Sequence, residues 1–245
     1  MAPAPPTEGA LNIRIGTSGW NYTEWRGSFY PSDMRPAGML AYYAARFSTV
    51  EVNNTFYRMP RATVVEGWAA AVPPGFSFVL KAPQRITHFA RLRDVDDPVR
   101  VFCDTARLLG PRLGPLLFQL PPNFKVDTGR LADLLALLPP DLRAAFEFRN
   151  PTWFTEEVYT RLAARNAALC IADNDEGATP AVATADWGYL RLRATGYTDE
   201  DLHAWLATMH RIGERWRDAY VFFKHEEKGT GPALGARLAK LLESA

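Results

Sequence analysis

A regular alternation between short apolar segments and helical patterns constrains this chain most. Eight segments have strand length and end at a turn signal or a polar cluster: Asn12–Gly16, Thr49–Asn53, Phe76–Lys81, Pro115–Gln119, Ala144–Arg149, Ala168–Asp173, Tyr189–Arg193 and Tyr220–His225. Seven helical patterns lie between or after them: Pro36–Phe47, Ala62–Ala71, Pro98–Leu109, Thr128–Leu138, Thr155–Asn166, Thr198–Arg217 and Gly231–Leu242. Strands that alternate with helices are typical of parallel β–α units.

Eight such units in 245 residues predict an α/β fold with a single TIM-like (β/α)8 barrel rather than an open doubly wound sheet. The sixth unit is irregular, because residues 174–188 include Pro180 and leave room for one turn of helix at most. We therefore expect a short or missing sixth helix. No low-complexity linker divides residues 11–245, which we expect to form one domain. Residues 1–10 are expected to be a disordered, Pro-rich tail rather than a secretory signal.

Composition narrows the class of protein further. Hydrophobic residues make up 47% of the chain, which suits a globular protein with a sizeable core. The 28 basic and 27 acidic residues nearly cancel, so the overall charge indicates neither a nucleic-acid nor a membrane-surface binder. No apolar run approaches the ~18–20 residues that cross a bilayer, so no membrane partner is expected. Cys103 and Cys170 form no C-x-x-C pair and are read as free thiols, which makes the cytoplasm the expected location.

Strand periodicity predicts a polar barrel interior. In the second strand Val50 and Val52 share one face, so Glu51 and Asn53 share the other. In a barrel the apolar faces pack against the helices, which directs the polar faces inward. Applied to all the strands, this places the following residues inside, with Lys224 or His225 added according to register: Arg14, Glu51, Asn53, Lys81, Gln119, Glu147, Arg149, Arg191 and Arg193.

Cations outnumber acids in this predicted interior. Buried charges are costly unless they are paired, and Glu51 and Glu147 can neutralise only two of the cations. Barrel enzymes bind their substrates at the mouth formed by the C-terminal ends of the strands. An excess of arginine and lysine there predicts a ligand with a phosphate or carboxylate group. The alternative is a structural network of salt bridges that closes the barrel.

The loops after the strands add candidate binding residues. The segment 16–31 combines glycines and hydroxyls, among them Ser18, with aromatic side chains such as Trp20. Tyr57 follows the second strand, and Trp153 follows the fifth. Hydroxyls and backbone N–H groups can cradle an anion, and aromatic rings can stack on a ligand. The same aromatics can equally form a small core between the loops.

Cofactor motifs are absent from the sequence. Gly16-Thr-Ser-Gly is neither a Walker motif nor a dinucleotide fingerprint, and neither H-E-x-x-H nor G-x-S-x-G occurs. His88 is expected to reach the mouth as a binding residue. His88 and His225, with Glu147 or Asp173, could also hold a single divalent ion, which is the less favoured alternative. The sequence therefore leaves the cofactor unknown.

A series of motifs, in chain order, resembles the YecE-like family, known as domain of unknown function 72. They are Ile15-Gly-Thr-Ser-Gly-Trp, Tyr-x-x-Trp-Arg-Gly-x-Phe-Tyr-Pro, Val50-Glu-Val-Asn-x-Thr-Phe-Tyr57, Phe78-Val-Leu-Lys81, Thr87-His88, Leu117-Phe-Gln-Leu-Pro121, Glu147-Phe-Arg149 with Trp153, and Tyr189-Leu-Arg191. The resemblance covers the chain from residue 11 and implies a TIM-like barrel, but no reaction. Two segments depart from it. Arg193-Ala-Thr-Gly stands where many members have His-Gly, and Phe223-Lys-His-Glu-Glu stands where many have an Asn-rich segment.

Three functions remain open at this point. The leading hypothesis is a hydrolase or lyase that holds an anionic substrate on Arg149, Arg193 and Lys81. In it, Glu147 or Glu51 acts as acid or base. Nearby arginines would keep such a carboxylate ionised, which suits a base. The second is a nucleic-acid-binding barrel related in fold to barrel endonucleases, which an analogy of fold alone suggests. The third is a non-catalytic sensor of a small anionic metabolite, in which both glutamates are structural.

Overall fold

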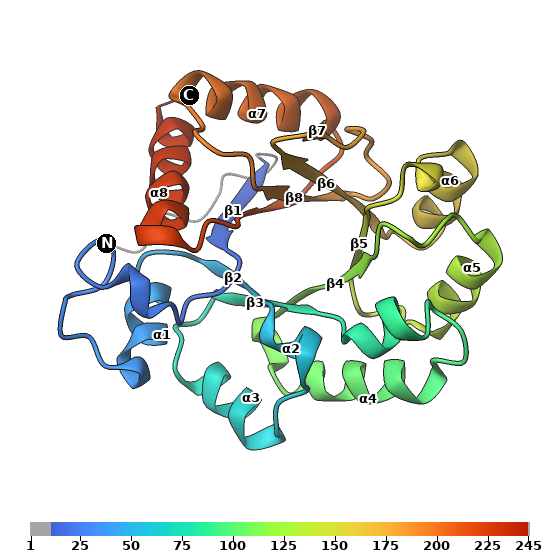
Figure 1. The fold of residues 1–245 in the computed structure, drawn as a ribbon, viewed down its shortest axis with the longest axis horizontal. Helices are drawn as coiled ribbons and strands as arrows, with labels where there is room; N and C mark the ends of the chain where they lie inside the picture. Colours follow the sequence, from blue (N-terminus) through green and yellow to red (C-terminus); the bar gives the residue numbers. More distant parts are fainter. Residues whose placement is uncertain (1–10, 245) are drawn as a thin grey trace.

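Eight parallel strands form the inner ring of the protein, which a computed structural model describes for residues 11–244 (Figure 1). In hydrogen-bonding order they run β1-β9-β8-β6-β5-β4-β3-β2. All eight predicted strands are present, which confirms the TIM-like barrel; the predicted tail at residues 1–10 lies outside the described part. The strands are β1 (Asn12–Thr17), β2 (Thr49–Val52), β3 (Ser77–Lys81), β4 (Leu113–Leu120), β5 (Ala144–Phe148), β6 (Ala168–Asn174), β8 (Trp187–Leu192) and β9 (Asp218–Phe223).

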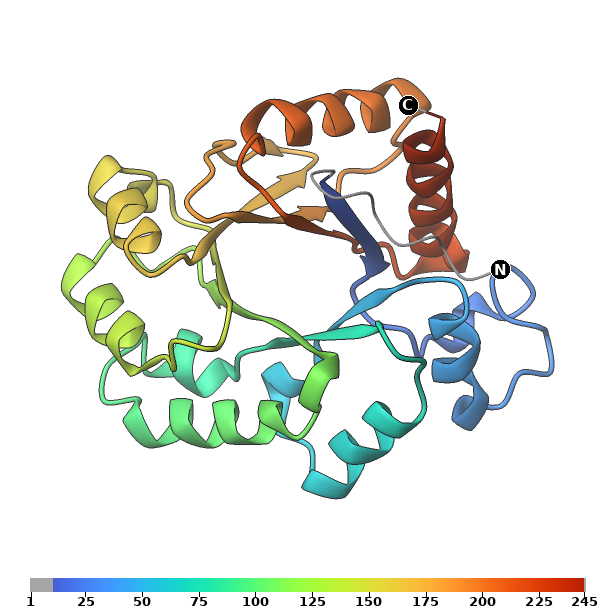
Figure 2. The same cartoon turned by 180° about the vertical axis from the view of Figure 1, so that it is seen from behind.

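Helices surround the ring on its outer side (Figures 1 and 2). All seven predicted helices are present, and a short α2 (Asn54–Tyr57) is added after β2. Helix α7 ends five residues before the predicted boundary at Arg217, at a C-terminal cap formed by Gly213, whose N–H donates to the Met209 carbonyl. The seven are α1 (Pro36–Ala44), α3 (Ala62–Ala70), α4 (Asp96–Arg107), α5 (Thr128–Leu137), α6 (Glu156–Ala163), α7 (Asp199–Ile212) and α8 (Thr230–Glu243).

The sixth unit lacks its helix, as Pro180 led us to expect. Instead, β6 turns back into the two-residue strand β7 (Gly177–Ala178), which pairs with it in antiparallel fashion. Extended chain then leads to β8. The buried hydroxyl of Thr184 fixes this chain to the start of β6, since it accepts from the Leu169 N–H at 2.8 Å and donates to the Ala167 carbonyl at 2.7 Å. These bonds replace the packing that a helix would supply.

The ring is nearly closed at a seam between β1 and β2. An isolated bridge joins Ser18 to Glu51 there. The hydroxyl of Tyr43, on α1, accepts from the Thr17 N–H at 2.8 Å and donates to the Thr49 carbonyl at 3.0 Å. A Cβ on Gly16 would lie 2.2 Å from that same carbonyl oxygen, so glycine is required for the two strands to approach this closely.

We expect Tyr43→Phe to lower the free energy of unfolding by about 1–3 kcal/mol, because it leaves buried backbone groups at the seam without a partner. Urea unfolding measures this change. Tyr42→Phe is the matched control, since the Tyr42 hydroxyl makes no hydrogen bond within residues 11–244. Equal stabilities of the two variants would show that Tyr43 does not hold the seam.

Strand faces divide the core into an outer and an inner layer. The outward-facing side chains pack against the helices, and they include Val50, Phe78, Phe146 and Leu190. The inward-facing ones form a smaller apolar cluster that includes Val79, Leu117, Ala145, Tyr189 and Phe222. Alternation along each strand thus has the predicted sense. Within residues 11–244, no helix combines the length and apolar character needed to cross a membrane.

Candidate functional site

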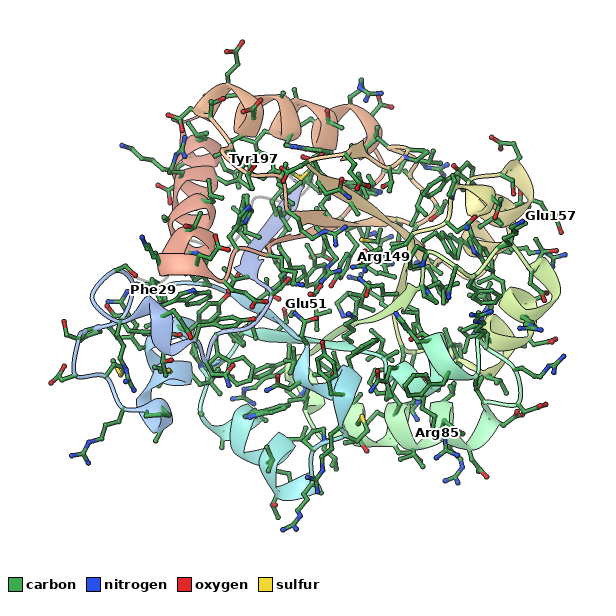
Figure 3. All side chains as sticks on the ribbon, in the orientation of Figure 1. Phe29, Glu51, Arg85, Arg149, Glu157 and Tyr197 are labelled. Atoms are coloured by element: carbon green, nitrogen blue, oxygen red, sulfur yellow. The ribbon has the colours of Figure 1, made fainter. Side chains whose placement is uncertain are left out.

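Three buried charged side chains meet inside the ring from separate strands: Glu51 of β2, Glu147 of β5 and Arg191 of β8. Arg191 Nη2 donates to Glu51 Oε1 at 2.8 Å, and its Nη1 donates to Glu147 Oε2. At most 1% of each side chain is exposed. Figure 3 shows Glu51 inside the ring, together with Arg149, whereas Glu157 lies on the outer side of α6. One guanidinium therefore bridges two carboxylates at the centre of the barrel.

Glu51 accepts two further hydrogen bonds. Ser18 Oγ donates to Oε1 at 2.8 Å, and the Tyr189 hydroxyl donates to Oε2 at 2.6 Å. Burial alone would raise the pKa of Glu51, but the charge of Arg191 and these two hydrogen bonds lower it below the ordinary value. Tyr189 was not among the predicted site residues. The signal was its position two residues before Arg191 on the same strand face.

Glu147 is surrounded by cations. Gln119 Nε2 donates to its Oε2 at 2.9 Å, and Arg149 Nε donates to its Oε1 at 3.2 Å. Arg193 Nη2 lies 3.5 Å from the same Oε1. Burial raises the pKa of Glu147, but the charges of Arg191, Arg193 and Arg149 outweigh it and hold that pKa far below the ordinary value. Glu147 therefore stays ionised and positions three guanidinium groups.

Lys81 lies at the C-terminal end of β3 and is 8% exposed. Its Nζ donates to Gln119 Oε1 at 2.8 Å and lies 4.0 Å from the centre of the Phe56 ring. No carboxylate of residues 11–244 lies within ion-pair distance of this ammonium group. Burial, followed by the charge of Arg191, lowers the pKa of Lys81 from 10.5 to about 7. Lys81 is thus the side chain of this cluster that changes its charge near neutral pH.

This lowered pKa predicts that stability rises with pH. Between about 7 and 10.5 the unfolded chain holds a proton on Lys81 that the folded chain has released, so raising the pH favours the folded state. From pH 7 to pH 9 we expect the wild type to gain about 2 kcal/mol in the free energy of unfolding relative to Lys81→Met. Urea unfolding of both proteins at the two pH values tests this. If the free energies of unfolding of the wild type and Lys81→Met differed by the same amount at both pH values, this prediction would be contradicted.

Two polar side chains at the rim have buried atoms without partners. The amide nitrogen and oxygen of Asn53, just after β2, form no hydrogen bond within residues 11–244, and neither does Nε of Arg193. Buried polar groups in proteins are nearly always hydrogen-bonded. The amide of Asn53 at the open end of the barrel is therefore suited to contact a ligand, whereas an unpartnered Nε is shared, in the described part of the chain, by Arg14, Arg112 and Arg191 and does not by itself mark a site.

His88 and Tyr57 both contact the ring of Phe56. A turn of π-helix at Arg85–Phe89 carries His88, whose ring lies edge-on to Phe56 at 4.8 Å. Turns of this kind often occur at functional sites. Burial, with the charges of Lys81 and Arg149, lowers the pKa of His88 to about 4, so this imidazole is neutral at pH 7. Tyr57 is 72% exposed and can contact a bound molecule only from the rim.

Three predicted site residues lie apart from this cluster. Arg14 Nη1 donates to the carbonyl of Gly75 at 2.9 Å, in the loop that precedes β3, so Arg14 belongs to the opposite end of the barrel. Trp20 is buried against Trp68 and Phe78. Trp153 is buried against Phe148, with ring centres 4.7 Å apart. Both tryptophans therefore serve packing between loops and barrel.

In the described part of the chain, no metal centre is found at the mouth, and a sizeable cavity lies elsewhere. Within residues 11–244, no group of three His, Cys, Asp or Glu side chains is arranged to hold a metal ion. A cavity of about 480 Å³ lies at the N-terminal end of the barrel, beside Arg107 and Arg143. Both arginines are paired, with Asp141 and Asp218 respectively, at 2.8 Å. Their charges are therefore already neutralised by the protein.

Comparison with known proteins identifies relatives over nearly the whole chain. UPF0759 protein YunF of Bacillus subtilis is 25% identical over 94% of this chain and 95% of its own length. UPF0759 protein YecE of Escherichia coli strain K12 is 33% identical over 59% of this chain; the chain spans about half the length of YecE, 51%.

Solved structures agree with this relationship. The crystal structure of a DUF72 family protein from Thermotoga maritima is 27% identical, with a TM-score of 0.84 over 95% of this chain and 99% of that chain. A DUF72 family protein from Enterococcus faecalis shares the fold, with 18% identity and a TM-score of 0.78 over 96% of this chain and 99% of that chain. The sequence model of the family described as "Protein of unknown function DUF72" matches residues 14–245. The chain therefore belongs to the DUF72 family.

Proposed function

We propose that this protein is an enzyme of the hydrolase or lyase type that binds a small phosphate- or carboxylate-bearing molecule at the C-terminal mouth of the barrel. The observation that carries the proposal is the uneven charge of the cluster. Lys81, Arg149, Arg191 and Arg193 face only two carboxylates, and both carboxylates are already engaged by several donors. An anion would neutralise the remaining positive charge.

Arg149 and Arg193 are the groups that would bind this anion. Their side chains are 36% and 16% exposed, whereas Arg191 is enclosed. Guanidinium groups match the geometry of phosphate and carboxylate with paired N–H donors. The amide of Asn53 supports the proposal, because neither its nitrogen nor its oxygen has a hydrogen-bond partner within residues 11–244.

In this proposal the two glutamates position other groups. A general base works best when its pKa lies near the working pH. The pKa of Glu147 lies far below that range, because Arg191, Arg193 and Arg149 offset its burial, and the pKa of Glu51 is lowered as well. The carboxylates thus fix the guanidinium groups in place for the anion. The two buried free cysteines, Cys103 and Cys170, suit a reducing compartment, and we place the function in the cytoplasm.

Titration calorimetry with inorganic phosphate and with acetate, at low ionic strength, tests the binding step. We expect phosphate to bind the wild type, and Arg193→Gln to weaken binding about 10–100-fold, the effect of losing one charge-assisted hydrogen bond. Arg14→Gln is the matched control, since Arg14 lies at the opposite end of the barrel. Equal weakening by both variants, or no binding of either anion, would contradict the proposal. Binding without turnover across a panel of phosphate esters and hydroxy acids would favour a sensor instead.

A second function, binding of nucleic acid, is favoured by one specific observation. The connections that follow β2 and β3 carry five arginines, and between residues 58 and 93 there is a single acid, Glu66. Tyr57 and Phe89, 72% and 73% exposed, lie in the same two connections. Basic groups and open aromatic rings together suit a nucleic-acid strand. The arginines are Arg58, Arg61, Arg85, Arg91 and Arg93.

Salt dependence separates this function from the first. The logarithm of the binding constant for a single-stranded oligonucleotide should fall steeply and linearly with the logarithm of the salt concentration, because bound phosphates release counterions. Tyr57→Ala should weaken binding further, by about 1–3 kcal/mol of lost stacking. Fluorescence anisotropy measures both effects. No binding at low salt would exclude the nucleic-acid function.

A further inference from the structure

We infer that Lys81 is the reactive amine of this site, and that it forms an imine with the carbonyl carbon of an anionic aldehyde or ketone. The inference rests on the anion binding proposed above and names the substrate class. It assigns to Lys81 a covalent role in place of the simple charge contact that its sequence suggested.

The surroundings of Lys81 distinguish it from the other lysines. The chain has only five, Lys81, Lys125, Lys224, Lys228 and Lys240, among 28 basic residues, and Lys81 alone is buried within the described part. A lysine buried for structural reasons normally pairs with a carboxylate. Lys81 instead contacts an amide oxygen and an aromatic ring. Its amine is therefore held in place without an ion pair that would fix it as ammonium.

Gln119 orients the amine through Glu147. The amide nitrogen of Gln119 donates to Glu147 Oε2 at 2.9 Å, which leaves its oxygen to face Lys81 Nζ at 2.8 Å. Gln119 and Glu147 are direct neighbours across β4 and β5. Because the strands fix both ends of this chain of bonds, Nζ has a defined position at the mouth.

The neighbouring charges keep a large share of the amine unprotonated. Burial and the guanidinium of Arg191 lower the pKa of Lys81 to about 7, so roughly half of the molecules carry a nucleophilic amine at neutral pH. Arg149 and Arg193 can hold the anionic end of a substrate near this amine. The Phe56 ring, 4.0 Å from Nζ, would stabilise the positive charge of a protonated imine.

The chemistry balances without a cofactor. The Nζ electron pair adds to the carbonyl carbon, one amine proton moves to the oxygen, and the resulting hydroxyl takes a second proton and leaves as water. The bond between the adjacent carbon and a hydroxyl-bearing carbon can then break, with its electron pair moving toward nitrogen. The hydroxyl-bearing carbon leaves as an aldehyde after its hydroxyl releases a proton, and an enamine remains, which fits the lyase type of the proposed function. Protonation of the enamine carbon and addition of water release the product and restore Lys81.

Reductive trapping tests the inference. The protein is incubated at pH 7 with dihydroxyacetone phosphate, or with pyruvate, in the presence of sodium cyanoborohydride, which at this pH reduces imines and spares ketones, and the five lysines are mapped by mass spectrometry. We expect one saturable adduct, on Lys81, which inorganic phosphate suppresses. Lys81→Met and Lys81→Arg should form no such adduct, and Lys240→Met, which removes an exposed lysine of α8, should form it fully.

The outcomes distinguish this inference from the proposed function. Labelling of Lys81 no faster than that of the four other lysines, with both probes, would overturn the imine. If phosphate still binds the same preparation in titration calorimetry, the proposed anion-binding function stands without it. If phosphate does not bind, the proposed function fails first. Circular dichroism of both Lys81 variants verifies that a missing adduct is not caused by unfolding.

Discussion

Arg191→Met is expected to lower the free energy of unfolding by about 3–5 kcal/mol, the cost of leaving buried charges uncompensated. Arg191 is buried and bonded to both Glu51 and Glu147. Methionine keeps most of the side-chain volume, so the loss reports on charge rather than on a cavity. For a chain of this length the change corresponds to a fall in Tm of roughly 10 °C.

The loss of stability caused by Arg191→Met should be smaller at acidic pH. In the wild type the lowered pKa values of Glu51 and Glu147 contribute stability above the ordinary carboxyl pKa of 4.5, and this stability is lost as the pH falls. Without Arg191, burial raises the pKa values of the two carboxyl groups. Protonation at low pH then removes the cost of burying unpaired charges in the variant. Urea unfolding at pH 7 and pH 4 measures both effects. Arg237→Met, which breaks an exposed ion pair with Asp199, is the control and should cost at most ~1 kcal/mol. A cost for Arg191→Met as small as this would contradict the ion-pair account.

Glu147→Gln should lower stability and strengthen anion binding at the same time. The substitution removes the carboxylate that lies within ion-pair distance of Arg149, Arg191 and Arg193, so about 3 kcal/mol of stability should be lost. The site then carries one more unit of positive charge. We expect this gain to outweigh the lost positioning of the guanidinium groups, so that phosphate binds about tenfold more tightly. Added phosphate should therefore raise the Tm of this variant more than that of the wild type.

Thermal unfolding with and without phosphate measures this difference. Glu157→Gln is the control, because Glu157 pairs with Arg161 on the exposed side of α6. Glu157→Gln should change the free energy of unfolding by at most ~1 kcal/mol and should leave the rise of Tm with phosphate unchanged. If Glu147→Gln were destabilised but responded to phosphate no more than the wild type does, Glu147 would hold the barrel together without shaping an anion site.

Sequence periodicity predicted the fold because β–α alternation is encoded locally. Every predicted strand was found, and the missing sixth helix followed from Pro180 and a short connection. Strand parity placed Glu51, Glu147 and Arg191 on the inward face, because alternation within a strand fixes which way each side chain points. The contacts between these residues are long-range, but the barrel topology makes them unavoidable.

Alternation along a strand predicts which face a side chain is on, but not how far along the barrel axis it lies. This is why some predicted site residues lie apart from the site. Arg14 faces inward near the start of β1 and reaches the N-terminal end, whereas Arg191 near the end of β8 reaches the centre. Trp20 and Trp153 lie on loops, whose side-chain directions follow from tertiary packing rather than from a local repeat. The lowered pKa of Lys81 depends on its burial, which strand periodicity predicted, and on the charge of Arg191, whose proximity the sequence around Lys81 does not reveal.

Anomalous diffraction from crystals soaked in selenate, a tetrahedral dianion like phosphate, tests the central claim most directly. The proposed anion site predicts the strongest selenium peak at the barrel mouth, with its oxygens about 2.7–3.2 Å from guanidinium nitrogens of Arg149 and Arg193. The same peak should be absent in the Arg149→Gln, Arg193→Gln double variant. Selenate found only at the opposite end of the barrel, beside Arg107 and Arg143, would contradict an anion site at the mouth.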